Sequence, residues 1–289
     1  MMVPVQGARW WRHPTAEVTG AAIDSRAVRD GDAFFAFRGA HVDGHAYVAD
    51  AAERGASIVV VEHEIDPEVA TCGVLVVPDV HRALLEFASD WRSRHDAHWI
   101  GITGSNGKTT TVRLVDAVLA TTMTGSASTR SFNNDIGLPV TMCSARGSYA
   151  VCEVGTSARG EIARLRDLLR PTIGLVTSIG RAHMEGLGGV EGVFDEKISL
   201  LEGLGGDRAI LNVDSDVARR RAPSGLTTYG RDAGDVRVEI LDSTTRSTRA
   251  RLSDGFEFLI PLPGAHNAVN ACGAILVGRA VGVPDDAIR

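Results

Sequence analysis

The sequence lacks three features that would place it in a specialised class. Its four cysteines, Cys72, Cys143, Cys152 and Cys272, are scattered and none belongs to a C-x-x-C pair, which argues against a zinc site or a disulfide framework and predicts reduced, mostly buried thiols. No apolar run approaches the ~18 residues of a membrane span, and the N-terminus "MMVPVQGARWWRH" lacks the apolar stretch of about 7 to 15 residues that marks a signal peptide. These absences predict a cytoplasmic protein that does not enter a membrane.

An excess of positive charge is also missing. The chain has 30 Lys and Arg residues against 36 Asp and Glu residues, a formal net charge of -6, so no global basic field exists to bind nucleic acid. What the chain does have is 289 residues, of which 44% are hydrophobic and 23% are charged. That balance is typical of folded globular proteins, and the length suffices for two ordinary domains.

The first region of the chain alternates short β-rich runs with helical patterns. The runs are "DAFFAFRG", "ASIVVVE" and "GVLVVPD", and the helical patterns are "AYVADAAERGA" and "HRALLEFASDWRSRH". This alternation is typical of an α/β unit. The polar stretch "SRHDAH" then precedes a new apolar strand near His98. We therefore predict a small N-terminal α/β domain over residues 1–97.

The second region, residues 98–289, predicts a larger doubly wound domain. The strand-like runs "WIGIT", "YAVCEVG", "TIGLVTSIG" and "RAILNVDSD" are separated by helical patterns, which favours a mostly parallel sheet. Residues 236–260 alternate polar and apolar side chains around an Asp-Gly turn, which predicts an antiparallel extension of that sheet. An apolar helix, "HNAVNACGAILVGRAVG", follows, and "VPDDAIR" resembles the first turn of another helix. We expect a further domain to be missing after Arg289.

A glycine-rich stretch, "GITGSNGKTTT" (residues 101–111), lies between a predicted strand and a predicted helix. That is the context in which backbone N–H groups and a helix N-terminus surround phosphate oxygens. Five residues separate Gly101 from Gly107, so the stretch reads T-G-x-x-G-K-T-T rather than G-x-x-x-x-G-K. Lys108 would neutralise the β- and γ-phosphates, and the Thr109 hydroxyl would bind Mg²⁺. The predicted ATP-binding residues are Gly104, Ser105, Asn106, Gly107, Lys108, Thr109 and Thr110; a purely structural turn is the alternative.

This loop and several further stretches resemble the Mur ligases, ATP-dependent enzymes that add amino acids or dipeptides to the peptidoglycan precursor. The stretches are "STRSFNNDIGLPVTM", "CEVGTSARGEIARL", "GLVTSIGRAHMEGLGGVEGVFDEK" and "PLPGAHNAVNACGA". Within the family they are most similar to the MurF branch, which adds D-alanyl-D-alanine. The segment "DSRAVRDGDAFFAFRGAHVDGHAYVADAAERGA" is similar to the UDP-sugar-binding domain that the MurE and MurF branches share. The resemblance covers essentially the whole chain.

The resemblance implies a two-step ligation in which an acyl phosphate is the intermediate. In this family ATP phosphorylates the terminal carboxylate of a peptide, and an incoming amine then displaces the phosphate. Anionic phosphates must meet an anionic carboxylate, so charge neutralisation is the main requirement. The implied catalytic residues are Lys108, His183 and Lys197, acting with two Mg²⁺ ions.

The metal-binding residues that the resemblance implies are Thr109, Glu153, His183 and Lys197. Glu153 ends the strand-like run "YAVCE" and would share one Mg²⁺ with Thr109, whereas His183 would bind the second. Lys197 follows His183 by 14 residues and would be carbamylated, because CO₂ converts a cation that a metal repels into an anionic oxygen ligand. The alternatives are a solvated carboxylate, a packed or surface histidine and an exposed helix lysine.

Five polar residues are implied to contact the peptide substrate or adenine. Thr129, Asn133 and Asn134 resemble the motif that meets the peptidyl substrate. Asn267 and Asn270 match residues that hydrogen-bond the adenine edge, which suits an amide because it both donates and accepts. Asparagine pairs also serve in turns, and "HN" at residues 266–267 could instead cap the following helix.

The uridine-diphosphate pocket implied by the resemblance lies in the first domain. Asp24, Ser25 and Arg26 match it, together with the loop over residues 38–44 that begins at Arg38. Both arginines could bind the diphosphate, or they could pair with surface carboxylates.

Several positions depart from the family pattern, namely Ala22, Arg130, Ser131 and Ser199, the last replacing an acidic residue that usually follows Lys197 by two places. The first hypothesis is still a MurF-type ligase acting on a UDP-MurNAc-peptide and D-Ala-D-Ala. We expect it to be poorly active, because the C-terminal domain of the family is absent from the chain. The alternatives are a non-catalytic nucleotide-binding homologue, a subunit that needs a separate C-terminal-domain partner, and a ligase for a different peptide.

Overall fold

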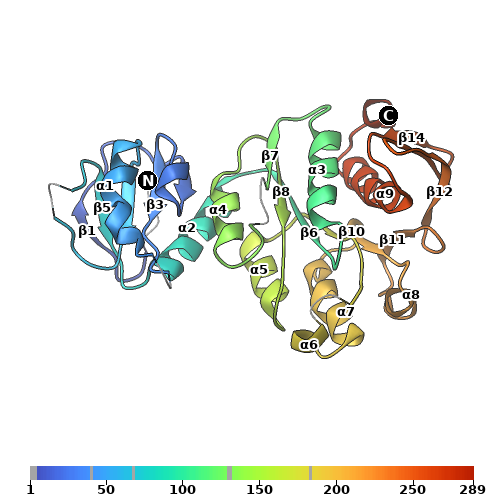
Figure 1. The fold of residues 1–289 in the computed structure, drawn as a ribbon, viewed down its shortest axis with the longest axis horizontal. Coiled ribbons are helices and arrows are strands. Elements are labelled where there is room, and N and C mark those ends of the chain that lie inside the picture. The colour runs from blue at the N-terminus through green and yellow to red at the C-terminus, as the bar shows by residue number, and fades with distance from the viewer. Residues whose placement is uncertain (1–4, 40–41, 67–68, 129–131, 182–183) are drawn as a thin grey trace. The chain divides into compact units, whose positions relative to one another are not determined.

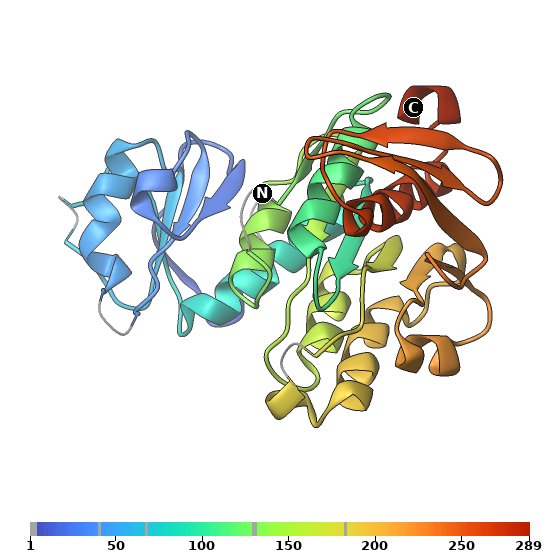
Figure 2. The same cartoon turned by 45° about the vertical axis from the view of Figure 1, so that its right-hand side comes forward.

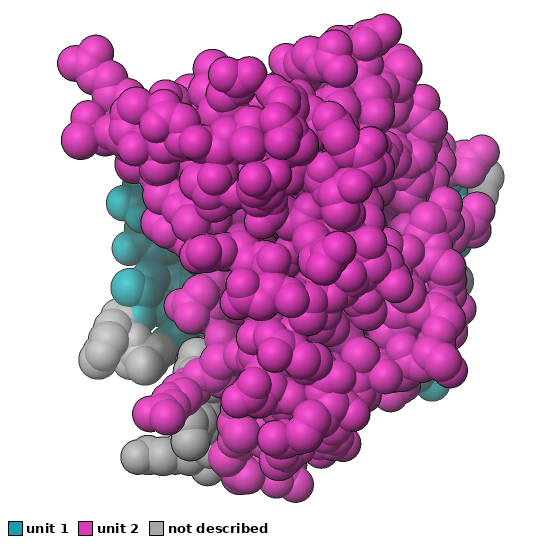
Figure 3. Space-filling model, turned by 90° about the vertical axis from the view of Figure 1, so that its right-hand side faces the viewer, with its two compact units in different colours: residues 1–95, 135–144 teal, residues 96–134, 145–289 magenta. Residues whose placement is uncertain are grey.

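The computed structural model describes residues 5–39, 42–66, 69–128, 132–181 and 184–289. The chain divides into two compact units, which Figure 3 colours separately. Unit 1 comprises residues 1–95 and 135–144, and unit 2 comprises residues 96–134 and 145–289. The expected second domain, residues 98–289, is therefore interrupted by a short segment that packs with the first unit.

Unit 1 is built around a five-stranded sheet in the order β1-β5-β4-β3-β2. Its strands are β1 (Arg9–Arg12), β2 (Gly20–Ala22), β3 (Asp32–Phe35), β4 (Ile58–Val61) and β5 (Gly73–Val76). β2 to β5 pair in parallel, and β1 pairs antiparallel with β5. All side chains of β3 and β4 are buried, as expected for parallel strands that are covered on both faces.

The helices of unit 1 are η1 (Ser25–Ala27), η2 (Gly44–Tyr47), α1 (Val48–Glu53), α2 (Val80–Arg94) and α4 (Gly137–Cys143). α2 buries Val80, Ala83, Leu84, Phe87 and Ala88, the spacing of one helical face. Six of the seven α4 residues are buried, and α4 contacts α2 and β2. A helix with so little polar surface must be covered by other elements, which explains why residues 135–144 belong to unit 1.

Unit 2 contains a nine-stranded sheet in the order β14-β13-β12-β11-β10-β9-β6-β8-β7. Its strands are β6 (His98–Thr103), β7 (Gly125–Ala127), β8 (Tyr149–Glu153), β9 (Ile173–Val176), β10 (Gly206–Asn212), β11 (Leu226–Gly230), β12 (Val236–Ser243), β13 (Thr248–Leu252) and β14 (Glu257–Ile260). Strands β6 to β12 pair in parallel with their neighbours in the sheet, whereas β12 with β13 and β13 with β14 form antiparallel pairs. The predicted α/β class, the mostly parallel sheet and its antiparallel extension are confirmed.

The helices of unit 2 are α3 (Lys108–Leu119), α5 (Glu161–Leu169), α6 (Met184–Leu187), α7 (Val190–Ile198), η3 (Ser199–Leu201), α8 (Asp216–Arg221), α9 (Ala265–Ala280) and α10 (Asp285–Ile288). α3 and α9 lie side by side in Figures 1 and 2, and they contact each other. Twelve of the 16 residues of α9 are buried, so this helix is an internal element rather than an amphipathic surface helix.

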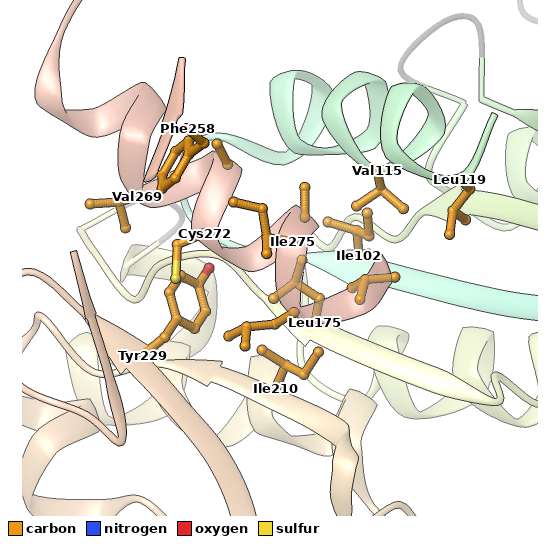
Figure 4. Close-up of a cluster of buried hydrophobic side chains, with 14 of the residues drawn as sticks. Ile102, Val115, Leu119, Leu175, Ile210, Tyr229, Phe258, Val269, Cys272 and Ile275 are labelled. Carbon is orange, nitrogen blue, oxygen red and sulfur yellow. The ribbon is translucent and has the colours of Figure 1, made fainter. Parts of the chain in front are cut away.

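One hydrophobic core joins α3 and α9 to the sheet. Figure 4 shows side chains of this core, including Ile102, Val115, Leu119, Leu175, Ile210, Tyr229, Phe258, Val269, Cys272 and Ile275. They come from four neighbouring parallel strands, from β14 and from both helices. The core fixes the C-terminal ends of β6, β8 and β9, which are adjacent in the sheet and carry the site. Among the described helices, none has the length and apolar composition needed to cross a bilayer.

Candidate functional site

The glycine-rich loop lies between the end of β6 and the start of α3, as predicted. Gly107 is the N-cap residue of α3 and has φ 82°, a left-handed backbone conformation that residues with a Cβ atom rarely adopt. A Cβ atom on Gly107 would also lie 2.5 Å from Asn270 Oδ1. Conformation and space therefore both require glycine at this position, where the backbone turns into the helix.

Lys108 is the first residue of α3 and folds back over the loop. Its Nζ atom donates a hydrogen bond of 2.9 Å to the Gly104 carbonyl oxygen. The first N–H groups of an α-helix have no partner within the helix, and its dipole favours negative charge at this end. The ammonium and the helix N-terminus thus bring positive charge and N–H donors together in an arrangement suited to phosphate.

Thr109, the second residue of α3, meets Glu153, the last residue of β8. The Thr109 hydroxyl donates to Glu153 Oε2 at 2.8 Å, and Glu153 is only 2% exposed. Adjacent oxygen ligands of octahedral Mg²⁺, each ~2.0–2.1 Å from the ion, lie about 2.9 Å apart. A buried carboxylate beside a hydroxyl at nearly that spacing fits the donor set that Mg²⁺ prefers, so these two residues could hold the ion.

Asn133 lies against the same carboxylate. Its side-chain Nδ2 atom donates to Glu153 Oε1 at 2.8 Å, and its backbone carbonyl oxygen accepts from Gly155 N at 2.7 Å. A Cβ atom on Gly155 would come within 2.6 Å of Asn133 Cγ, so glycine is needed for this approach. Thr129, which was predicted to lie nearby, falls outside the described residues, and Asn134 directly follows Asn133 in the chain.

Lys197 is buried in α7, with 2% of its surface exposed, so it is not the exposed helix lysine of the alternative interpretation. Desolvation, and secondly the Lys108 ammonium, lower the pKa of Lys197 to about 8, against an opposing effect of Glu196. The repulsion indicates that the two ammonium groups are near each other. Lys108 and Lys197 are thus brought together, whereas His183 lies outside the described residues.

Glu196 is a buried carboxylate that the sequence did not identify. It is 6% exposed, and it accepts hydrogen bonds from Gly160 N at 2.6 Å and from Ile162 N at 2.8 Å. These donors lie at the N-terminus of α5, on the segment that follows Glu153. Glu196 therefore ties α7, which carries Lys197, to the segment after β8. Because 34 to 36 residues separate the partners, no local pattern could have indicated the contact.

Replacing Glu196 by alanine is expected to lower the free energy of unfolding by about 2 kcal/mol, because the Gly160 and Ile162 N–H groups would stay buried without an acceptor. Chemical denaturation followed by circular dichroism measures this change. Glu202→Ala is the matched control, since Glu202 is in an exposed ion pair with Arg166 and its side chain is 65% exposed. A loss in the control as large as that of Glu196→Ala would contradict the assignment.

The two asparagines of α9 are both 8% exposed but have different surroundings. Asn267 Nδ2 donates to the Pro263 carbonyl oxygen at 2.8 Å, so this amide group is engaged by the main chain. The N-cap residue of α9 is Gly264, which has no side chain to cap the helix, so His266 and Asn267 do not occupy the N-cap position that the alternative interpretation gave them. Asn270 lies against Gly107, which brings it to the phosphate loop.

In unit 1, Asp24 and Arg26 pair with each other. Arg26 Nε and Nη2 donate to the two carboxylate oxygens of Asp24 at 2.9 and 2.8 Å, and its side chain is 82% exposed. This hydrogen-bonded ion pair raises the pKa of Arg26. Ser25 is 5% exposed and bonds to Asp50, lowering the pKa of that carboxyl group. Arg26 thus adopts the surface ion pair that was the alternative to diphosphate binding.

The loop that begins at Arg38 is organised by Asp43 and His45. Arg38 Nε donates to Asp43 Oδ2 at 3.2 Å, and His45 Nδ1 lies 2.7 Å from Asp43 Oδ1. Hydrogen bonds from the His45 backbone N–H and side chain lower the pKa of Asp43 to about 2. His45 Nε2 accepts from Glu62 N at 3.0 Å, so its ring anchors the loop to the end of β4. Sequence reasoning did not single out His45.

The fold and the loop at its centre define a doubly wound α/β protein of the phosphate-loop type. Residues 102–278 match the family described as Mur ligase middle domain, and residues 17–92 match the one described as Mur ligase family, catalytic domain. The chain belongs to the Mur ligase family, which confirms the predicted resemblance.

Individual relatives agree with this membership. UDP-N-acetylmuramoyl-tripeptide–D-alanyl-D-alanine ligase of Bacillus subtilis is 33% identical over 279 residues, which cover 94% of this chain and 61% of the relative. The crystal structure of MurF from Acinetobacter baumannii matches with a TM-score of 0.81 at 28% identity, over 98% of this chain and 64% of that one. MurF of Thermotoga maritima, solved in complex with ADP, has the same fold, with a TM-score of 0.76 at 23% identity over 94% of this chain and 65% of that one. The chain thus spans about three-fifths of the length of these relatives.

Proposed function

We propose that the chain is the part of a MurF-type amide ligase that binds ATP and the UDP-linked peptide. Such a ligase joins D-alanyl-D-alanine to a UDP-MurNAc-tripeptide at the expense of ATP. The observation that carries this proposal is the hydrogen bond between the Thr109 hydroxyl and the buried Glu153 carboxylate, next to the Lys108 ammonium that folds over the glycine-rich loop. The buried Lys197 amine, whose pKa the Lys108 charge helps to lower, supports it. Relatives named for this activity match over nearly the whole chain. In this proposal residues 98–289 bind ATP, and residues 1–97 bind the UDP-linked substrate.

The reaction requires that the anionic ATP phosphates and the anionic peptide carboxylate be held close together. The peptide carboxylate attacks the γ-phosphorus of ATP, ADP leaves, and the amine then attacks the acyl phosphate and expels inorganic phosphate. Mg²⁺, when bound by Thr109 and Glu153, supplies charge stabilisation to the phosphates. Lys108 and the N–H groups of the loop bind and orient the triphosphate. Asn133, which donates a hydrogen bond to Glu153, would orient the peptide of the UDP-linked substrate.

The role proposed for Lys197 is an oxygen ligand formed by carbamylation. A neutral amine adds to CO₂ through its nitrogen lone pair, and one proton is lost as the anionic carbamate forms. A pKa near 8 makes the neutral amine far more available near pH 7 than it is for an ordinary lysine. The Lys108 ammonium, whose charge acts on Lys197, would also stabilise an anionic carbamate. His183 remains a proposed ligand of the second Mg²⁺, and Asn267 and Asn270 remain proposed adenine contacts.

The test is calorimetric titration of the 289-residue chain with ATP and Mg²⁺, followed by ADP release with UDP-MurNAc-tripeptide and D-Ala-D-Ala. We expect ATP binding and slow release of ADP. A normal ligase rate would contradict the expected low activity, and absence of ATP binding would overturn the proposal. Binding without substrate-stimulated hydrolysis would favour a non-catalytic homologue or a subunit that needs a separate partner, and a panel of other peptides tests the third alternative.

Replacing Glu153 by glutamine is expected to raise the Mg²⁺ concentration needed for half-maximal ATP binding about tenfold, because a neutral amide is a poorer ligand for a hard cation. The measurement is an ATP titration at a series of Mg²⁺ concentrations. Glu202→Gln, on an exposed side chain, is the control and should leave the dependence unchanged. An unchanged Mg²⁺ dependence in Glu153→Gln would remove this residue from the proposed metal site.

A further inference from the structure

The segment after β9, residues 177–180, is hydrogen-bonded to the phosphate loop along its length. Ser105 N donates to the Ser178 carbonyl oxygen at 2.9 Å, and Ser105 Oγ accepts from Gly180 N at 2.8 Å. Asn106 N donates to Ser178 Oγ at 2.9 Å. The run "TIGLVTSIG" was predicted as one strand, but β9 ends at Val176, and the remaining residues form this contact.

The contact depends on a very close approach between the two segments. A Cβ atom on Gly104 would lie 1.9 Å from Thr177 Oγ1, and one on Gly180 would lie 3.3 Å from Ser105 Cβ. Thr177 itself is only 3% exposed. The glycines therefore allow two loops from neighbouring strands to pack backbone against backbone, which side chains would prevent.

The Asn106 carbonyl group is the centre of this arrangement. Its oxygen accepts from Thr177 Oγ1 at 2.6 Å and from Ser178 Oγ at 3.1 Å. In a planar trans peptide the carbonyl and the following N–H point in opposite directions. Holding the Asn106 carbonyl toward residues 177–178 thus aims the Gly107 N–H the other way. Within the part of the chain that the structure describes, the Gly107 N–H makes no hydrogen bond.

We infer that Thr177 and Ser178 are positioning residues for nucleotide binding. Their hydroxyls hold the Asn106–Gly107 peptide in the orientation that presents the Gly107 N–H to a phosphate oxygen before ATP arrives. Preorganisation of this kind raises affinity because less conformational freedom is lost on binding. The inference rests on the proposed function, since it assumes that the loop binds the triphosphate, and it adds two residues that never need to touch ATP.

Thr177→Val and Thr177→Ser test this role, because valine keeps the shape of threonine and removes the hydroxyl, whereas serine keeps the hydroxyl. We expect Thr177→Val to raise the Kd for ATP with Mg²⁺ about tenfold, and Thr177→Ser to stay within about twofold of wild type. Thr172→Val is the matched control. Thr172 Oγ1 accepts from Trp99 N at 2.9 Å and donates to the Trp99 carbonyl oxygen at 3.2 Å, at the opposite end of the same strand.

Each variant is titrated with ATP and Mg²⁺ by calorimetry, and its unfolding is measured without nucleotide. A selective loss of affinity in Thr177→Val, with serine rescue and an unaffected Thr172→Val, supports the inference. Unchanged affinity in Thr177→Val, or an equal loss in Thr172→Val, overturns it. If Thr177→Val does not fold, Ser178→Ala provides the same comparison. Failure of the wild-type chain to bind ATP defeats the proposed function itself, whereas wild-type binding that the Thr177 hydroxyl does not affect defeats only the positioning role.

Discussion

Replacing Lys108 by methionine is expected to weaken ATP binding about a hundredfold, which corresponds to ~2.7 kcal/mol. The ammonium lies over the loop, where its Nζ atom bonds to the Gly104 carbonyl oxygen, and a hydrogen bond to a charged group contributes about 1.5–3 kcal/mol. Methionine keeps most of the aliphatic stem but supplies neither charge nor donor. The measurement is calorimetric titration with ATP and Mg²⁺.

Arg113→Met is the control for the change in charge. Arg113 lies on the same helix, one turn beyond the loop, and is exposed. It has the same formal charge as Lys108 but lies five residues further from the helix N-terminus, where the phosphate is proposed to bind. A comparable loss in Arg113→Met would show that the general field of the unit, rather than a local contact, determines affinity. Full affinity in Lys108→Met would contradict the proposed triphosphate site.

The parts of the site that the sequence predicted are those governed by local geometry. Residues 98–119 contain a buried strand, a glycine-rich turn and an amphipathic helix in direct succession. Each is visible in the local sequence pattern, so the phosphate loop between the strand and the helix could be located. Glu153 was recognisable as the polar residue that ends an apolar strand, and its role at a metal was implied by the resemblance. Lys197 was placed by resemblance, and only the structure shows that it is buried near Lys108.

The parts that the sequence did not reveal depend on contacts between distant segments. Glu196 bonds to residues 34 to 36 positions away, and Thr177 bonds to Asn106 across 71 positions. Glycine and serine in "TSIG" gave no signal that a strand had ended, since apolar residues continue up to Val176 and Ile179 follows. Arg26 is another example, because ion pairing with Asp24 depends on side-chain geometry that composition does not specify.

Replacing Lys197 by methionine is expected to raise the free energy of unfolding at pH 7 by about 3 kcal/mol. Lysine in the unfolded chain keeps its ordinary pKa of 10.5, whereas burial and the Lys108 charge lower the pKa in the folded chain to about 8. Each unit of difference corresponds to ~1.36 kcal/mol of preference for the neutral form. Below pH 8 the folded chain must bury a charged ammonium, and methionine of similar length removes that penalty.

The pH dependence identifies this cause. Between pH 8 and 10.5 the unfolded chain binds more protons at this lysine than the folded chain does, so wild-type stability gains from this residue as the pH rises. The advantage of Lys197→Met should therefore be full below pH 8 and decline toward pH 10.5. Denaturant titrations across this range, in buffer freed of CO₂, measure it. An advantage that does not vary with pH would point to packing rather than charge.

Added bicarbonate then separates the structural role of the amine from its proposed chemistry. If CO₂ adds to Lys197, the anionic carbamate beside Lys108 replaces a repulsion by an attraction, and ¹³C-bicarbonate should give a carbamate NMR signal in wild type that Lys197→Met lacks. The stability difference between the two chains should narrow in the same samples. ATP with Mg²⁺ should strengthen the signal in wild type, because a carbamate that binds the metal is stabilised by it. A stability difference that bicarbonate leaves unchanged, together with the absence of the signal, would mean that Lys197 acts as a buried amine and not as a metal ligand.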